Sequence, residues 1–388
     1  MGSPPKVSNA PPQPAIAKTQ HYLFLDGLRG VAALLVMVMH WLDGHGLKAF
    51  GGSLLAVDYF FMLSGFVVTH AYEQKMRRGV GFAAGFGSFM MKRIIRLHPI
   101  IAMGFALGAA RFGMLAVIED DGLSAPTLLG EFARSVLLLP RLDDDITQFF
   151  ELNNAMWSLH FEFLAYIAFG LVLYRLRSRW LWVLLLAAMP GVLLWVEAVY
   201  GDAAPLWSQD TSFAAYMSGL ARVFFAFAAG MLIYRTMPRW SRLPLPSGRW
   251  LVILLAAPLA LSKLQMPVAL AGALLLLVFP YILAAGSQVA DRPVLSKLDT
   301  MLGNLSYPLY ALHIPIIWTL SGAFRTLGIG FAEEPVLNGL IILPITIVAS
   351  YAAFVLYDRP LRRVLNGWLA RRRKHATVSH APSEAARY

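Results

Sequence analysis

The chain has 388 residues, of which 58% are hydrophobic and 14% charged, and its formal net charge is +11. Such a composition leaves too little polar surface for a soluble globular protein, so we expect most of the chain to face lipid. The basic residues lie in short loops between apolar runs, which argues against a nucleic-acid-binding protein. Cysteine is absent, so disulfides, zinc thiolates, iron–sulfur clusters and a cysteine nucleophile are excluded, and no metal is expected.

Three segments are predicted. Residues 1–20 are rich in Pro, Ala and Ser and indicate a disordered tail. This tail does not indicate a signal peptide, because the apolar run that follows is long enough to remain as a membrane span. Residues 21–360 are expected to form one transmembrane domain, and residues 361–388 a basic cytoplasmic tail.

Apolar runs of about 17 to 25 residues predict an all-α membrane bundle of about ten transmembrane helices. The predicted spans are 22–42, 53–72, 94–118, 156–175, 180–199, 212–235, 250–263, 267–285, 302–325 and 335–357. Loop charges alternate in sign along the chain, with basic residues in every second loop, so both termini are expected in the cytoplasm. The long outer segment 119–155 contains an apolar patch from Thr127 to Leu139 that predicts a short interfacial helix.

The first span contains three ionisable residues, Asp26, Arg29 and His40. Ionisable groups inside a membrane are costly and are functional candidates by default. Arg29 and His40 are eleven residues apart, which places them on one helix face about 16 Å apart. A purely structural alternative pairs Arg29 with Asp26 and leaves His40 at the membrane interface.

Further ionisable residues are expected at the depth of His40. Asp58 lies in the outer half of the second span, and His160 and Glu162 begin the fourth. A histidine among carboxylates is typical of a general base and its orienting partner. We therefore expect Glu162 or Asp58 to orient His40.

Arg93 and Arg96 begin the third span and share a helix face at its inner boundary. They are interpreted either as charges that set the topology or as a clamp for a phosphate-bearing donor. In the ninth span, Pro308 precedes His313, which is interpreted as either a site residue or a buried histidine bonded to a neighbouring helix. Arg222 of the sixth span either lines a pore or is paired.

The segments that contain these residues resemble the acyltransferase-3 family of membrane O-acyltransferases, and the resemblance covers residues 21–365. The matching blocks are LDGLRGVAALLVMVMH, DYFFMLSGFVV, RIIRLHP, WSLHFEF, SYPLYALHIPI and YDRP, in the family's order. The chain departs from the family pattern at Phe163, where a second Glu is frequent, and at Asp358, where Glu is usual. The motif residues that the resemblance adds to the candidate site are Ser64, Trp157, Ser158 and Tyr307.

The resemblance implies transfer of an acyl group, most often from cytoplasmic acetyl-CoA, to a hydroxyl of a carbohydrate-containing acceptor across the membrane. It implies that Arg29 and His40 are essential, that Arg93 and Arg96 bind the donor, and that Glu162 belongs to the site. A bacterial inner membrane is the expected location. No esterase-like domain is expected after the last span.

The mechanism expected on this basis uses His40 to deprotonate the acceptor hydroxyl, with an acyl-histidine route left open. The donor's pantetheine arm would extend along the first span from Arg29 to His40. A transporter or flippase whose buried charges line a substrate path is the alternative from another class.

Overall fold

The computed structural model describes residues 22–78, 81–118, 123–142, 148–201, 213–240, 246–262, 265–290, 293–329 and 334–379. Within these ranges every regular element is helical, which confirms the all-α prediction. The tail predicted at residues 1–20 lies outside the described residues.

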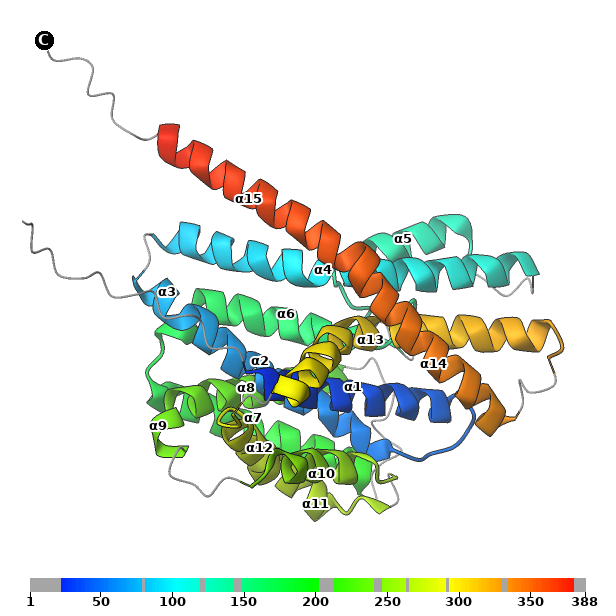
Figure 1. Cartoon of the computed structure of the whole chain (residues 1–388), viewed down its shortest axis with the longest axis horizontal. Coiled ribbons are helices and arrows are strands. Elements are labelled where there is room, and N and C mark those ends of the chain that lie inside the picture. The colour runs from blue at the N-terminus through cyan, green and yellow to red at the C-terminus, as the bar shows by residue number, and fades with distance from the viewer. Residues whose placement is uncertain are drawn as a thin grey trace, which may run out of the picture.

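The helices follow the predicted order along the chain (Figure 1). They are α1 (Leu23–Asp43), η1 (Gly51–Leu55), α2 (Ala56–Val68), η2 (Thr69–Glu73), α3 (Gln74–Arg78), α4 (Phe82–Ile118), α5 (Ala125–Val136), α6 (Met156–Leu171), η3 (Leu173–Arg175), α7 (Ser178–Tyr200), α8 (Phe213–Arg235), α9 (Met237–Trp240), α10 (Gly248–Leu259), α11 (Val268–Ala273), η6 (Leu274–Val278), α12 (Phe279–Gly286), α13 (Pro293–Thr326), α14 (Pro335–Ala353), η8 (Phe354–Asp358) and α15 (Arg359–Ser379). The short helix predicted in the outer segment is confirmed as α5.

Seven helical stretches among the described residues are long and apolar enough to cross a membrane. They are Leu23–Asp43, Gly51–Arg78, Ala84–Val117, Ser178–Tyr200, Phe213–Arg235, Val268–Gly286 and Pro335–Arg372. Of the three remaining predicted spans, two correspond to the shorter apolar helices α6 and α10, and the third lies within α13. The chain is therefore an integral membrane protein, while the number of spans and the side of each terminus stay predictions.

Most of the helices run along the long axis of the molecule, and α15 continues the line of α14 and η8 away from the bundle (Figure 1). The main contacts are those of α1 with α13 and of α8 with α2 and α7. Two glycines allow α1 to approach α13 closely: a Cβ at Gly27 would lie 2.1 Å from Asp299 Oδ1, and one at Gly30 would lie 2.5 Å from Leu302 Cβ. Residues of α1 and α13 that are distant in sequence are thus brought together.

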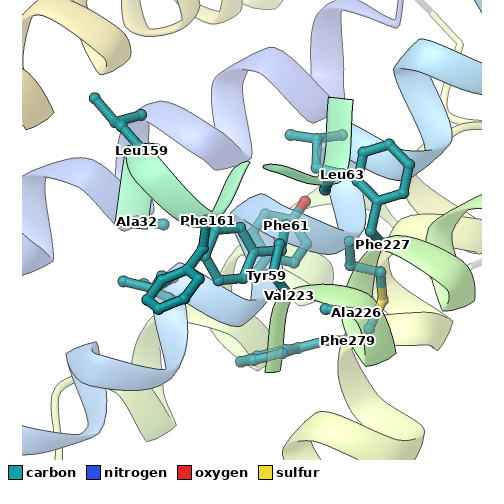
Figure 2. Packing of buried hydrophobic residues seen from close by; sticks show 14 of the residues in the cluster. Ala32, Tyr59, Phe61, Leu63, Leu159, Phe161, Val223, Ala226, Phe227 and Phe279 are labelled. Atoms are coloured by element: carbon teal, nitrogen blue, oxygen red, sulfur yellow. The ribbon is translucent and has the colours of Figure 1, made fainter. Parts of the chain in front are cut away.

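Aromatic side chains fill the core between α2, α6, α8 and α12 (Figure 2). Tyr59, Phe161, Phe227 and Phe279 are each no more than 1% exposed. Edge-to-face ring contacts, such as that between Tyr59 and Phe279 with centroids 5.6 Å apart, fix their orientation. This rigid packing holds α2 and α6, which both contribute residues to the site described below.

A close approach of α2 and α8 predicts that Gly230→Val destabilises the fold. A Cβ at Gly230 would lie 1.9 Å from the Met62 carbonyl oxygen, and this backbone atom cannot move aside as a flexible side chain would. We expect the free energy of unfolding to fall by about 1–3 kcal/mol or more. The measurement is the temperature at which the monodisperse peak disappears in size-exclusion chromatography. Gly322→Val is the control, because no heavy atom lies within 4 Å of the added Cβ there; equal stability of the two variants would contradict the prediction.

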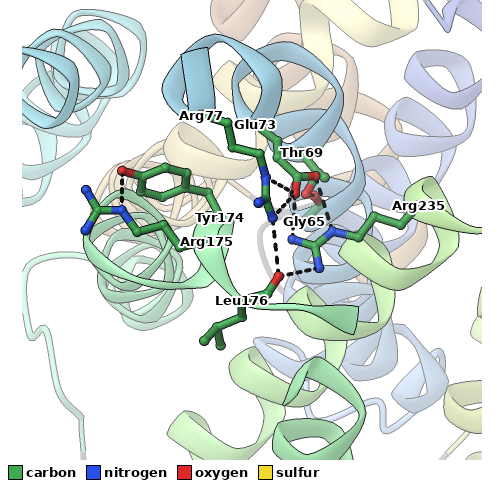
Figure 3. A network of polar contacts seen from close by, with 8 residues as sticks. All are labelled: Gly65, Thr69, Glu73, Arg77, Tyr174, Arg175, Leu176 and Arg235. Carbon is green, nitrogen blue, oxygen red and sulfur yellow. Dashed lines mark hydrogen bonds and ion pairs between the residues drawn. The ribbon is translucent and has the colours of Figure 1, made fainter. Parts of the chain in front are cut away.

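A polar network joins helix ends at the side predicted to be cytoplasmic (Figure 3). Glu73 accepts hydrogen bonds from Arg77, at 3.0 Å from its Nε, and from Arg235, at 2.6 Å from its Nη2. Both arginines also donate to the carbonyl oxygen of Leu176. Basic residues that the sequence places in inner loops therefore also tie α3, α8 and the segment after η3 together.

Candidate active site

Two adjoining cavities lie among α1, α2, α4 and α13. Cavity A, of about 100 Å³, also reaches α6, and cavity B, of about 410 Å³, also reaches η8 and α15. Arg29, Leu63, Val67, Arg96 and Tyr307 line both cavities, so the two are neighbouring parts of one hollow region. The predicted site residues that line cavity A are Arg29, Ser64, Arg93, Arg96, Ser158, Glu162 and Tyr307.

Arg29 is anchored on three sides at the junction of the cavities. Its guanidinium forms an ion pair with Asp26, with Nη2 and Oδ1 2.8 Å apart, and donates to Ser306 Oγ at 2.8 Å and to the Gly303 carbonyl at 3.0 Å. The predicted pairing with Asp26 is thus confirmed, and it coexists with a place in the cavity wall. An arginine held by α1 and α13 presents a fixed positive charge.

Arg93 and Arg96 share a face of α4, as their spacing predicts, but their surroundings differ. Arg93 is 5% exposed, donates to Tyr72 Oη at 2.9 Å, and lies with its guanidinium carbon 5.5 Å from the centre of the Tyr166 ring. It lines cavity A, whereas Arg96 lines both cavities. Arg96 has no hydrogen bond or ion pair among the described residues, so its charge is available to an anion.

Glu162 lies in the wall of cavity A within a small network. Tyr166, one turn further along α6, donates to Glu162 Oε1 at 2.5 Å, and its hydroxyl lies 2.8 Å from Ser64 Oγ. Because Tyr166 also stacks with Arg93, the network links the carboxylate to the donor-clamp candidate.

The far side of cavity A carries two hydroxyl groups. Ser158 Oγ and Tyr310 Oη are 2.6 Å apart, and both residues line the cavity. The Tyr310 ring lies 5.9 Å from the ring of His313. Tyr307, one turn earlier on α13, donates to the Leu97 carbonyl at 2.6 Å and so fixes α13 against α4.

His40 pairs with His313 next to this far side. Their nitrogens, Nδ1 of His40 and Nε2 of His313, are 3.2 Å apart. Nδ1 of His313 lies near the carbonyls of Leu309 and Tyr310 at 3.0 and 2.8 Å, so it carries the proton in the neutral ring and leaves a lone pair on Nε2. Since Nδ1 of His40 also lies 3.0 Å from the Val36 carbonyl, both of its neighbours are acceptors. The hydrogen-bond pattern therefore assigns the proton of His40 to Nδ1 and a lone pair to its Nε2.

The hydrogen-bond contacts of His40 are with Val36 and His313, whereas the two carboxylates expected to orient it, Asp58 and Glu162, contact other partners. Asp58 forms a bidentate ion pair with Arg222, at 3.0 Å from Nε and 2.7 Å from Nη2. The Arg222 guanidinium stacks over Trp195 at 3.6 Å and over Trp157 at 5.1 Å. Asp58 and Trp157 thus belong to a buried cluster that joins α2, α6, α7 and α8, and the paired interpretation of Arg222 is confirmed.

His160 does not join His40 either. Its Nδ1 lies 2.8 Å from the Leu138 carbonyl and its Nε2 lies 3.1 Å from Tyr216 Oη. Both ring nitrogens are engaged, so His160 fixes the segment after α5 against α6 and α8.

Sequence reasoning missed Tyr166 and Tyr310 as members of the site. The signal was present for Tyr166, since it follows Glu162 by four residues and so shares its helix face. Tyr310 stands three residues before His313, again on one face of a helix. Among the described residues, no group of three or more His, Asp and Glu side chains could hold a metal ion.

Comparisons with known proteins identify the family. The sequence pattern of the family named Acyl_transf_3, described as an acyltransferase domain, matches residues 22–355. The chain is 24% identical to an O-acetyl transferase of Shigella phage Sf6 over 334 residues, 82% of this chain and 90% of that protein. It is 40% identical to "Protein 2 in picA locus" of Rhizobium radiobacter over 120 residues, which are 31% of this chain and only 56% of that protein. No solved structure matches the chain.

The family match covers most of the chain, including all the helices that line the cavities except α15. The helical membrane architecture and the arginines in the cavity walls fit a membrane enzyme with a donor and an acceptor substrate. The chain therefore belongs to the acyltransferase-3 family of enzymes that transfer acyl groups.

Proposed function

We propose that the protein is an O-acetyltransferase that takes an acetyl group from cytoplasmic acetyl-CoA. The acceptor is a hydroxyl of a carbohydrate-containing molecule on the outer side of a bacterial inner membrane. The similarity to the phage O-acetyl transferase supports acetyl as the group transferred. This proposal includes cytoplasmic positions for both termini.

One observation carries the proposal: the residues that line cavity B and then cavity A extend from the arginines to the neighbours of the histidine pair. Cavity B lies at the N-terminal end of α1, where Tyr22 and Asp26 line it. Arg29 lines both cavities, and Tyr310 lines cavity A next to His313. A donor whose charged end lies at the arginines would therefore point its thioester toward His40.

The arginines position the donor by charge. Arg29 and Arg96 face the junction of the cavities, where they bind anionic phosphates of acetyl-CoA. The wall of cavity A is otherwise rich in apolar side chains, including Phe60, Phe61 and Leu159, which suit the largely uncharged pantetheine arm. In this arrangement Glu162 and Tyr166 contact the pantetheine arm of the donor rather than His40.

His40 acts as the general base through Nε2. This atom removes the proton of the acceptor hydroxyl, the hydroxyl oxygen bonds to the thioester carbonyl carbon, and the carbon–sulfur bond breaks. The protonated ring then returns the proton to the departing thiolate of coenzyme A. His313 keeps the reactive tautomer by accepting from Nδ1 of His40, and the positive charge formed on His40 is shared across that contact.

The experiment that tests the proposal is mass spectrometry of surface glycans and lipids from cells fed labelled acetate. Cells with the wild-type chain are compared with cells that carry His40→Ala. We expect a labelled ester only with the wild-type chain. Identical label in every fraction would refute the O-acetyltransferase assignment.

Replacing His313 with Leu is expected to lower kcat by about 5-fold while the KM for acetyl-CoA stays unchanged. The reason is the loss of the hydrogen bond that selects the tautomer of His40, worth about 1 kcal/mol. His313→Gln should restore part of the rate, because an amide oxygen can accept from Nδ1. The measurement is steady-state kinetics of the purified protein over a range of pH, where His313→Leu should also change the profile.

His45→Leu is the control, since this histidine contacts the Trp41 carbonyl at the end of α1 and lines neither cavity. A merely structural role for His313 would give equal activities for the Leu and Gln variants at equal amounts of folded protein. That outcome would remove His313 from the mechanism.

A further inference from the structure

Cavity B presents three arginines from three different helices. Arg29 comes from α1, Arg96 from α4 and Arg362 from α15. Arg93, the expected partner of Arg96, lines only cavity A. The larger cavity therefore has a third cation that the sequence motifs did not indicate.

A buried carboxylate fixes Arg362 in this position. Asp358 is 0% exposed and forms an ion pair with Arg362 one helical turn later. The Arg362 guanidinium also lies 5.6 Å from the centre of the Phe354 ring, which lines the same cavity. The neighbouring Arg363 is exposed, so the two consecutive arginines have different surroundings.

Two π-helical turns flank cavity B. The first, η2, contributes His70 and Ala71 at the end of α2, and the second, η8, contributes Phe354 immediately before α15. A π turn adds one residue to the helical repeat and is frequent at functional sites. Here the turn in η8 precedes the pair of Asp358 and Arg362.

The charges around cavity B are unbalanced. Asp26 compensates Arg29 and Asp358 compensates Arg362, whereas Arg96 has no ion pair among the described residues. A cavity of about 410 Å³ with three guanidinium groups in its wall suits a ligand with several phosphate charges. A single phosphate would leave part of this surface without a partner.

We propose that cavity B binds the 3′-phosphorylated adenosine diphosphate part of the donor, with Arg362 as a phosphate contact beside Arg96 and Arg29. This inference rests on the proposed use of acetyl-CoA. It assigns a donor-binding role to α15 and reduces that of Arg93, whose guanidinium lies against Tyr72 and Tyr166. The adenosine end then enters from the side where α1 begins and α14 ends.

The test measures binding of coenzyme A and the KM for acetyl-CoA with the purified full chain in nanodiscs of zwitterionic lipid. Arg362→Met should raise both the Kd for coenzyme A and the KM for acetyl-CoA by about 10-fold or more, as expected for the loss of a charged hydrogen bond. The kcat should be unchanged. Arg363→Met is the matched control, because it removes the same charge from the next, exposed residue and should change neither. Adenosine 3′,5′-bisphosphate should compete with coenzyme A in wild type and do so less well against Arg362→Met.

A second variant distinguishes loss of binding from misfolding. Arg362→Met leaves Asp358 buried without its partner, so the double variant Asp358→Asn/Arg362→Met removes both charges and should show the same loss of binding at wild-type thermal stability. Normal coenzyme A affinity in the folded double variant would overturn the inference.

Other outcomes separate the possible failures. If wild type binds coenzyme A and Arg96→Met weakens it while Arg362→Met does not, only the role of Arg362 is wrong. If wild type binds no coenzyme A, the proposed function itself fails. If the bisphosphate competes equally in both proteins, and anionic nanodiscs stabilise wild type more than Arg362→Met, cavity B binds a lipid phosphate instead and the inference is overturned.

Discussion

His40→Ala is expected to lower the turnover number by about 10²- to 10⁴-fold, the usual contribution of a general base. The structure gives the reason, since the contacts of Nδ1 with Val36 and His313 leave the lone pair of His40 on Nε2. The measurement is the rate of acetyl transfer from labelled acetyl-CoA by purified protein, at saturating donor. Turnover within a few-fold of wild type would remove His40 from the mechanism.

Donor binding provides the internal control for this variant. His40 lines neither cavity, so the affinity for coenzyme A should be unchanged in His40→Ala. Rapid quenching of wild type in neutral denaturant, with labelled acetyl-CoA and no acceptor, separates the two chemical routes: protein-bound label would support an acyl-histidine, and its absence direct transfer. Weakened donor affinity in the variant would indicate that the loss of activity came from a distorted cavity.

Arg222→Met is expected to destabilise the fold by about 3–5 kcal/mol, the usual cost of breaking a buried ion pair from one side. Asp58 and Arg222 are 2% and 4% exposed and make a bidentate contact. Removal of the guanidinium leaves the Asp58 charge without a partner among α2, α6, α7 and α8. The measurement is thermal unfolding in detergent, with the yield of folded protein as a second readout.

The double variant Asp58→Leu/Arg222→Met should recover much of this stability, because neither charge then remains buried alone. Arg177→Met is the control for loss of one positive charge, since Arg177 is exposed. If Arg222→Met is as stable as Arg177→Met, the ion pair does not hold the four helices together. Normal stability with complete loss of activity would instead indicate that the pair of Asp58 and Arg222 acts in catalysis.

The positions of the helices could be predicted from apolar runs because each span must satisfy its own backbone hydrogen bonds in lipid. Each of the ten predicted segments overlaps a helix among the described residues, yet α10 ends at Leu259 rather than 263, α4 begins at Phe82 rather than 94 and α13 begins at Pro293 rather than 302. These extensions contain charged residues such as Lys92 and Asp299, which an apolar window leaves out. Hydropathy therefore locates the lipid-facing part of a helix and underestimates its length.

Local pairs in the site could also be predicted from the sequence, because helical periodicity fixes which residues share a face. The ion pair of Asp26 with Arg29 and the common face of Arg93 and Arg96 are of this kind. The contact of His40 with His313 could not be predicted in this way, since similar depth in the membrane does not decide which helices are neighbours.

The sequence by itself determined that the protein is a helical membrane protein. It also determined the order of the helices and the helix faces that carry charged residues. Only the tertiary structure decided that His40 meets His313, 273 residues away, and that Asp58 meets Arg222, 164 residues away. Periodicity acts within one helix, whereas these pairs depend on which helices pack closely. The glycine contacts of α1 with α13 and of α2 with α8 provide that proximity, because backbones can approach only where no Cβ intervenes.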